Sequence, residues 1–234
     1  MKCIVPDRNE LEQCTVRVIR SPERARPDVR VVETEGRRYV VKDYSPGALP
    51  FKRALGAYLV LREKIAYERA QGVAGVPGLA GTLGPCALVT EFIEGSEATS
   101  APAGLLDEGF FQRLNGLVKE LHARGVAHGD LKKLENILVT PDGRPYLVDF
   151  TAAFVTGSSP LSAAVFPSLC DDDIRAVSKL KARCAPHLLN EEERRFLSER
   201  STMEKLFRWS RRYVRYLVKF YSTPRDQRGA VELK

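Results

Sequence analysis

The sequence has no apolar run of about 18 residues, the length that a membrane-spanning helix requires. Its first residues lack the apolar stretch of a secretory signal peptide. The cysteines are odd in number and lack C-x-x-C spacing, so neither a disulfide framework nor a zinc site is predicted; they are Cys3, Cys14, Cys86, Cys170 and Cys184. Internal repeats and low-complexity tracts are also missing. These absences favour a protein of the reducing cytoplasm.

Polar groups suited to phosphoryl transfer are concentrated in residues 128–150. That reaction needs a carboxylate to take the proton of the acceptor hydroxyl, oxygen ligands for Mg²⁺, and a cation for the transferring phosphate. Asp130, Lys132, Asn136 and Asp149 offer these groups within 20 residues. The segment therefore predicts phosphoryl transfer.

The pattern around these groups predicts a helix followed by a β-hairpin. Apolar residues recur at helical spacing before a stop at Gly125; they are Phe110, Phe111, Leu114, Leu117, Val118 and Leu121. Residues 137–140 and 146–148 are predicted to form two short strands joined by a Pro-Asp-Gly turn. Antiparallel pairing would bring Asn136 and Asp149 to the same end of this hairpin. Two oxygen ligands there suit Mg²⁺ bound together with ATP.

These motifs resemble the catalytic loop and metal-binding motif of the protein kinase-like superfamily. His128, Gly129 and Asp130 stand where that superfamily has H-R-D, Asn136 where it has the catalytic-loop asparagine, and residues 149–151 where it has D-F-G. The chain departs from this pattern in the glycine at 129, in one extra position between the aspartate and the asparagine, and in the threonine at 151. It thereby resembles small atypical kinases, among them bacterial lipopolysaccharide core (Kdo/heptose) kinases and related short Ser/Thr kinase-like proteins.

The resemblance implies an α+β, two-lobed protein kinase-like fold in a single domain over residues 1–234. The N-lobe would be an antiparallel sheet plus one main helix and would end near residue 91, with a hinge over 91–95. The C-lobe, over 96–234, would be shortened and mostly helical. A chain of 234 residues can bury a substantial core but is short for an additional domain.

The N-terminal half contains the nucleotide-binding parts that the resemblance implies. A strand-like run ends in Lys42, which would hold the α- and β-phosphates, and Val40 would lie against the adenine. A predicted helix over 51–70 offers Glu63 and Glu68 as partners for this lysine. They lie roughly 140° apart around the helix, so only one can face it. The resemblance favours Glu63.

Residues 87–95 form an apolar strand that runs into a glycine-terminated link, which resembles the hinge between kinase lobes. Thr90 would be the gatekeeper, and the backbone of Glu91 and Ile93 would be presented to adenine. Leu138 would form the floor of the base pocket.

A glycine-rich loop over the phosphates is missing between the strands predicted at 16–19 and 29–32. Without glycine, close approach of the backbone to phosphate is harder, and arginine side chains are an alternative ligand. Arg24 and Arg26 are the candidates, and a solvated basic turn is the competing interpretation.

The segment after Asp149 is short and has no A-P-E-like sequence. A helix with an acidic cap is expected to begin at residue 171. Asp172 or Asp173 would either brace the catalytic-loop backbone, as the resemblance implies, or simply cap this helix. So short a segment offers little platform for an extended peptide and favours a sugar, lipid-linked or other small acceptor.

Neighbouring side chains have lesser or undecided roles. His128 is expected to be a structural hydrogen-bonding residue rather than a general base, and His122 and His187 to be ordinary helix or surface residues. Lys132 is expected to contact the γ-phosphate, with Lys133 as the alternative because the extra loop residue shifts the register.

Residues 205–221 carry six cations interleaved with aromatic residues. Such a helix either lies on an anionic membrane, with Trp209 and Tyr216 at the headgroup level, or forms the last helix of the C-lobe. Nucleic acid is not expected as a partner because no recognised binding motif accompanies the charge.

These parts predict an enzyme that transfers the γ-phosphoryl group of ATP to a hydroxyl, with ATP and Mg²⁺ as cofactors. Asp130 would deprotonate the acceptor, Asn136 and Asp149 would bind Mg²⁺, and Lys42 would hold the phosphates. The expected acceptor is a lipopolysaccharide-core or other small molecule; the alternatives are an atypical protein Ser/Thr kinase and a nucleotide-binding pseudokinase. We expect a cytoplasmic monomer, peripheral on the inner face of the membrane if residues 205–221 bind lipid.

Overall fold

The computed structural model describes residues 10–21, 27–45 and 50–198. The predictions for Arg24, Arg26 and residues 205–221 therefore lie outside the described residues. Met1–Leu189 form one compact unit, which holds every element below except α5 (Glu191–Ser198). That helix belongs to the second unit, which begins at Asn190. None of the described helices combines the length and apolar character needed to span a membrane.

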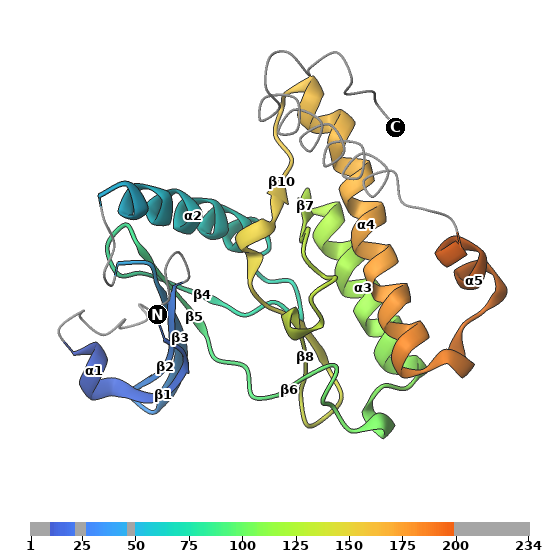
Figure 1. The fold of residues 1–234 in the computed structure, drawn as a ribbon, viewed down its shortest axis with the longest axis horizontal. Coiled ribbons are helices and arrows are strands. Elements are labelled where there is room, and N and C mark those ends of the chain that lie inside the picture. The colour runs from blue at the N-terminus through green and yellow to red at the C-terminus, as the bar shows by residue number, and fades with distance from the viewer. Residues whose placement is uncertain (1–9, 22–26, 46–49, 199–234) are drawn as a thin grey trace, which may run out of the picture. The chain divides into compact units, whose positions relative to one another are not determined.

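The N-terminal part is an antiparallel sheet in the order β1-β2-β3-β5-β4 (Figure 1). Its strands are β1 (Thr15–Arg20), β2 (Asp28–Thr34), β3 (Arg37–Asp43), β4 (Leu79–Thr82) and β5 (Ala87–Glu91). Valine-rich segments favour strands because β-branched side chains pack well on a pleated surface. One face of the sheet forms a small core with α1 (Leu11–Cys14), built from Leu11, Val32, Tyr39, Val41 and Val89. The other face carries Val29, Val40 and Lys42, which line a cavity. The strands predicted from the sequence are confirmed.

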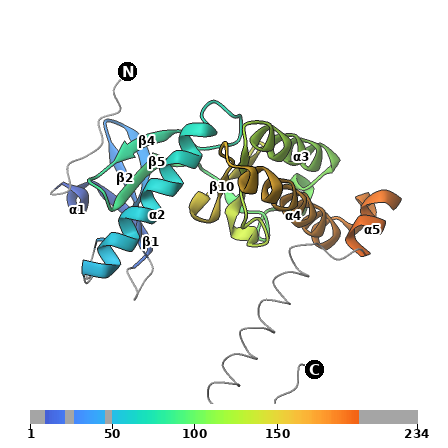
Figure 2. The same ribbon diagram turned by 90° about the horizontal axis from the view of Figure 1, so that it is seen from above.

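Helix α2 (Pro50–Arg69) is the main helix of this part, as predicted over 51–70. It lies against β4 and β5 (Figure 2) and also contacts the short turn η3 (Phe150–Ala152). Its inner side buries Val60, Ala66 and Tyr67. Its outer side leaves apolar residues exposed, namely Leu55, Tyr58, Leu61 and Ile65.

Helix α3 (Glu108–Ala123) is the centre of the C-terminal core. It begins at Asp107, whose carboxylate accepts a hydrogen bond from the backbone N–H of Phe110 at 2.7 Å and so satisfies one free donor of the first turn. All six apolar residues predicted for its inner face are buried. Gly125 follows at φ 75°, as expected for a helix stop. Helices α3 and α4 lie side by side (Figures 1 and 2).

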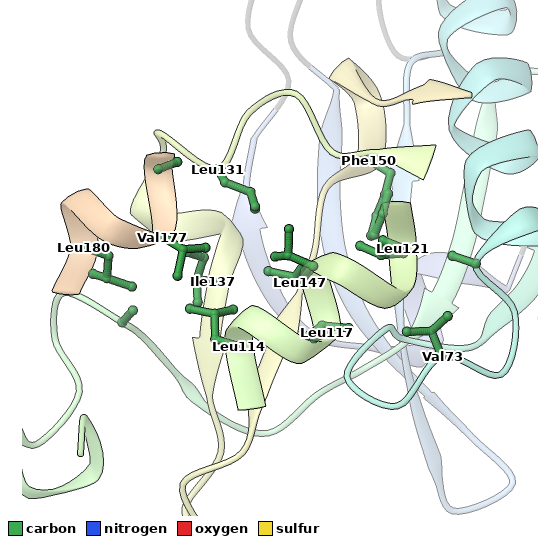
Figure 3. Packing of buried hydrophobic residues seen from close by; sticks show 14 of the residues in the cluster. Val73, Leu114, Leu117, Leu121, Leu131, Ile137, Leu147, Phe150, Val177 and Leu180 are labelled. Atoms are coloured by element: carbon green, nitrogen blue, oxygen red, sulfur yellow. The ribbon is translucent and has the colours of Figure 1, made fainter. Parts of the chain in front are cut away.

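The predicted hairpin is present as β8 (Ile137–Val139) and β9 (Pro145–Leu147), with Ile137 opposite Leu147. Figure 3 shows Ile137, Leu147 and Phe150 among the apolar side chains packed around α3. Further short elements complete this part: β6 (Ser96–Glu97), which pairs with β8, and β7 (Val126–Ala127), which pairs with β10 (Phe154–Val155). The 3₁₀ turns are η1 (Ala103–Leu105), η2 (Leu134–Asn136) and η4 (Pro186–Leu188).

Helix α4 (Pro160–Cys184) corrects one prediction. It begins eleven residues before position 171, with Ser159 as its N-cap accepting from the N–H of Ser162 at 3.1 Å. Pro160 suits the first turn, where its missing N–H is no loss, but Pro167 lies inside the helix. The small residues of this segment gave no helical signal in the sequence, so the first half of α4 was not predicted. Asp171 to Asp173 therefore lie in mid-helix and cap nothing.

Candidate active site

A cavity of about 540 Å³ lies between the sheet and the β8–β9 hairpin. Nine of the eleven predicted site residues line it: Val40, Lys42, Glu63, Thr90, Glu91, Ile93, Asn136, Leu138 and Asp149. The volume is within the roughly 300–1,000 Å³ range of ligand pockets. Asp130 and Lys132 are the two predicted residues that are not among its lining residues.

Lys42 is held between two carboxylates at the inner end of the cavity. Its Nζ lies 3.1 and 3.0 Å from the two oxygens of Glu63 and 2.6 Å from Oδ1 of Asp149. The ion pair expected between β3 and α2 is thus present, and Glu63 is buried. The rival candidate, Glu68, pairs with Lys64 on the outer side of α2 instead.

The charges of this group are strongly coupled. Burial alone would lower the pKa of Lys42, but the attraction of Glu63 and then of Asp149 outweighs it and raises that pKa. Burial raises the pKa of Glu63 against the pull of the lysine. For Asp149, burial acts upward, but the lysine and hydrogen bonds from Thr151 hold its pKa well below the usual range. Asp149 is therefore ionised and Lys42 protonated near neutral pH.

Thr151 adds a hydroxyl to the centre of this group. Its Oγ1 accepts from Lys42 Nζ at 2.5 Å and lies 2.6 Å from Asp149 Oδ1 and 3.0 Å from Glu63 Oε2. Its backbone N–H also donates to Asp149 Oδ1 at 3.3 Å. Thr151, at the position where the resemblance implied a glycine, thus connects the lysine to both acids.

The hairpin and its preceding loop position Asn136 and Asp149. The N–H of Val148 donates to the carbonyl oxygen of Asn136 at 3.0 Å, which holds together the two chain segments that end at the cavity. Asn136 Nδ2 donates to the carbonyl oxygen of Asp130 at 3.1 Å, so the loop closes on itself despite its extra residue. Asp149 has left-handed backbone angles, with φ 63°.

The oxygens of this pair fit a magnesium ion. Within the described residues, neither Oδ1 of Asn136 nor Oδ2 of Asp149 has a hydrogen-bond donor, and both residues line the cavity. One amide and one carboxylate oxygen suit Mg²⁺, which takes its remaining ligands from water and nucleotide phosphate. Among the described residues, no group of three or more histidine, cysteine or acidic side chains is arranged so that it could hold a metal ion.

The two loop lysines have different partners. Lys133 Nζ lies 2.6 Å from Oδ2 of Asp130, and this contact raises the pKa of Lys133. Lys132 Nζ instead lies 3.4 Å from Asp172 Oδ2. Of the two alternatives left open by the sequence, the structure brings Lys133 and not Lys132 to the carboxylate of Asp130.

Asp173 braces the catalytic loop from helix α4. Its buried carboxylate accepts from the N–H groups of His128 at 2.7 Å and Gly129 at 2.9 Å. The bracing role offered to Asp172 or Asp173 therefore falls to Asp173. His122, expected to be an ordinary helix residue, is 3.2 Å from the same carboxylate and belongs to this network.

His128 has the structural role expected of it. It is buried, and its Nε2 lies 3.0 Å from the carbonyl oxygen of Val148. Its ring packs on Phe150 at 4.7 Å between centroids, and Phe150 packs on Tyr67 of α2 at 4.8 Å. Burial lowers the pKa of His128, which keeps the ring neutral. This stack ties α2 to the catalytic loop.

The structure distinguishes the two backbone positions, Glu91 and Ile93, that the sequence assigned to adenine. The N–H of Glu91 donates to Gly78 O at 2.8 Å, so this donor is used inside the protein. Within the described part of the chain, no hydrogen bond occupies the backbone of Ile93, which lines the cavity. Leu138 also lines it, while its neighbours Ile137 and Val139 are buried on the other side of β8.

Comparison with known proteins identifies the fold. No family model matches the sequence, and no curated protein matches it either. Among solved structures, the Rio2 kinase from Chaetomium thermophilum matches with a TM-score of 0.56 at 16% identity, covering 78% of this chain and 62% of that one. The chain has a kinase-like fold. A second structure, the Rio2 kinase-ADP/Mg²⁺-phosphoaspartate complex from the same organism, matches this kinase-like fold with a TM-score of 0.58 at 15% identity, covering 83% and 65%.

The kinase-like chain spans less than two thirds of the length of these Rio2 kinases. The similarity to these two structures shows the kinase-like fold, and the more specific resemblance to lipopolysaccharide core kinases stays a prediction.

Sequence reasoning missed several residues of the site. Arg17, Ile19 and Arg20 of β1 line the cavity, and no motif marked them. Tyr67 also lines it, one helical turn after Glu63, a spacing that would have placed it on the same face of α2.

Proposed function

We propose that this chain is an ATP-dependent phosphotransferase that acts on a hydroxyl, with Mg²⁺ as cofactor. The observation that carries the proposal is the contact of Lys42 with both Glu63 and Asp149 inside a cavity that Asn136 also lines. A pseudokinase that only binds nucleotide has no need of this arrangement together with Asp130. The printed name of one structural neighbour includes ADP and Mg²⁺, which supports the same cofactors here.

Each side chain of the site would have a separate role in the transfer. Mg²⁺ with ATP would supply the phosphoryl group and neutralise its charge. Lys42 holds the phosphates, and Glu63 keeps this lysine in place. Asn136 and Asp149 direct oxygens at the metal position. Asp130, half-buried beside the loop, orients the acceptor hydroxyl and takes its proton. Lys133, in contact with Asp130, is better placed than Lys132 to offset charge on the transferring group.

We propose a small acceptor, such as the sugar of a lipopolysaccharide core. Residues 156–159 alone separate β10 from α4, so the segment that follows Asp149 has little length for a peptide platform. An atypical protein kinase is the second candidate, favoured by the names of the structural neighbours. We also propose a cytoplasmic location, with residues 205–221 as the contact to anionic lipid if the acceptor is lipid-linked.

The proposal is tested with purified protein and radiolabelled ATP. Binding of Mg·ATP is measured first, and transfer is then followed in a membrane-lipid fraction and, separately, in a protein fraction. Label in lipid-linked sugar supports the first acceptor class, and label in protein supports the second. Neither binding nor turnover with any hydroxyl acceptor would refute the phosphotransferase.

Two variants separate binding from chemistry. Asp149→Ala removes a metal ligand and is expected to abolish Mg²⁺-dependent ATP binding. Asp130→Asn keeps the shape of the loop and removes the proton acceptor, so binding is retained while transfer falls by roughly a hundredfold or more. Equal loss of binding in both variants would contradict these roles.

A further inference from the structure

Three cations line the cavity, and they differ in their partners. Lys42 is fully engaged by Glu63 and Asp149. Arg17 and Arg20 come from β1 at the edge of the sheet. Within the described residues, neither guanidinium group has an ion pair or hydrogen bond. The cavity therefore contains unpaired positive charge in addition to its neutralised lysine.

The register of the sheet places these arginines in two neighbouring rows on the face that carries the cavity. Arg20 lies opposite Val29, and Val29 lies opposite Lys42. Directly opposed residues of antiparallel strands point to the same face, so Arg20 and Lys42 share one row across three strands. Arg17 belongs to another row, in which Val31 and Val40 lead to Thr90 of the hinge strand.

Two irregularities in β1 set which of its residues share this face. The register of β1 against β2 shifts between Thr15 and Arg17 and again between Val18 and Arg20, so Val16 and Ile19 are extra residues. As a result both Ile19 and Arg20 line the cavity, although they are adjacent in sequence. Arg20 is also the last residue of β1, where the connection to β2 begins.

That connection, residues 21–27, contains no glycine. Without glycine, close approach of a backbone to phosphate is harder. A guanidinium group offers a fork of donors that matches phosphate oxygens and keeps its charge at any relevant pH. We infer that Arg20 binds the phosphates of the nucleotide, in the place that a glycine-rich loop occupies in related folds. The inference rests on the proposed function, since it names a further residue of the same site.

The test compares ligands with and without phosphate. Affinities for Mg·ATP and for adenosine are measured by calorimetry on the full chain, for the wild type and for Arg20→Gln. The expected result is a loss of about tenfold or more for ATP, with adenosine affinity unchanged. Arg20→Lys keeps the charge but loses the fork of donors. Its affinity for Mg·ATP is expected to lie between those of the wild type and Arg20→Gln.

Two further variants serve as controls. Arg37→Gln removes the same charge from the far end of β3, outside the cavity, and is expected to leave both affinities unchanged. Arg17→Gln, at the hinge end, is expected to change the ATP-to-adenosine ratio less than Arg20→Gln does. An unaltered ratio in Arg20→Gln, or an equal loss of ATP affinity in Arg37→Gln, would overturn the inference. A wild type that binds neither ligand would instead overturn the proposed function, and the inference with it.

Discussion

Thr151 and Lys42 are joined by a hydrogen bond of 2.5 Å between the hydroxyl and the ammonium group, across 109 positions of sequence. The same hydroxyl has one proton to donate and two carboxylate oxygens within reach, from Asp149 and Glu63. It therefore bonds one acid at a time while it accepts from the lysine. A glycine at this position offers none of these contacts.

The hydroxyl can be removed without changing the shape of the side chain. Thr151→Val is expected to lower the free energy of unfolding by about 1 kcal/mol, because Lys42 and the acids lose a partner. It is also expected to weaken Mg·ATP binding, since Asp149 is less firmly held. Thr151→Ser restores the hydroxyl and serves as the control. Urea unfolding and ATP titration check both effects, and a serine variant that behaves like the valine variant would argue against the hydroxyl.

The lowered pKa of Asp149 leads us to expect a particular dependence of the unfolding free energy on pH. Its folded pKa lies below its unfolded value, so its contribution is present above the unfolded pKa, near 3.8, and is lost as pH falls through the lower folded pKa. Asp149→Asn lacks this contribution. Between pH 6 and pH 3, the wild type is therefore expected to lose more unfolding free energy than the variant. Urea titrations at a series of pH values measure both slopes, and parallel slopes would be inconsistent with the pKa direction.

The hydrogen bonds of Asp173 to the loop are expected to contribute to the free energy of unfolding. Asp173→Ala leaves the N–H groups of His128 and Gly129 without their acceptor and is expected to cost about 3 kcal/mol of unfolding free energy. Asp171→Ala, an exposed change on the same helix, is the control and is expected to have little effect. Chemical denaturation compares the two. Equal small losses would mean that the brace contributes nothing to stability.

Gly129 has a backbone conformation and close neighbours that disfavour any side chain at this position. The glycine has φ 76°, and a Cβ added there would lie 2.7 Å from the carbonyl oxygen of Ala152. Gly129→Ala is expected to lower the unfolding free energy by roughly 1–3 kcal/mol, and Gly129→Arg by at least as much. Gly116→Ala, in open space on α3, is expected to stabilise by about 0.5–1 kcal/mol. Thermal melts of the three variants test this difference in sign.

The sequence predicted those parts of the fold whose signals are local. Valine-rich runs marked β2 and β3, six apolar residues at helical spacing marked α3, and a Pro-Asp-Gly turn marked the β8–β9 hairpin. Since the hairpin fixes its own geometry, the approach of Asn136 and Asp149 to one cavity followed from local pattern. The choice of Glu63 over Glu68 needed the family resemblance, because periodicity alone allowed either.

What the sequence could not predict depends on register and on distant contacts. Arg20 faces the cavity because of a bulge at Ile19, and a one-residue shift of register reverses the face of a strand residue. Asp173 sits in the middle of a helix, where no capping pattern reveals its role. The first half of α4 was hidden by its small residues and by Pro167, because proline is disfavoured in the interior of a helix.

The brief passage from β10 to α4, only residues 156–159, has a consequence for control. Kinases that are activated by phosphorylation of a long loop can be kept inactive after synthesis. On the proposed function, residues 156–159 are too few to form such a loop. Thr151 and Lys42 already hold Asp149 in place. Activation by phosphorylation of such a loop is therefore not expected of this chain.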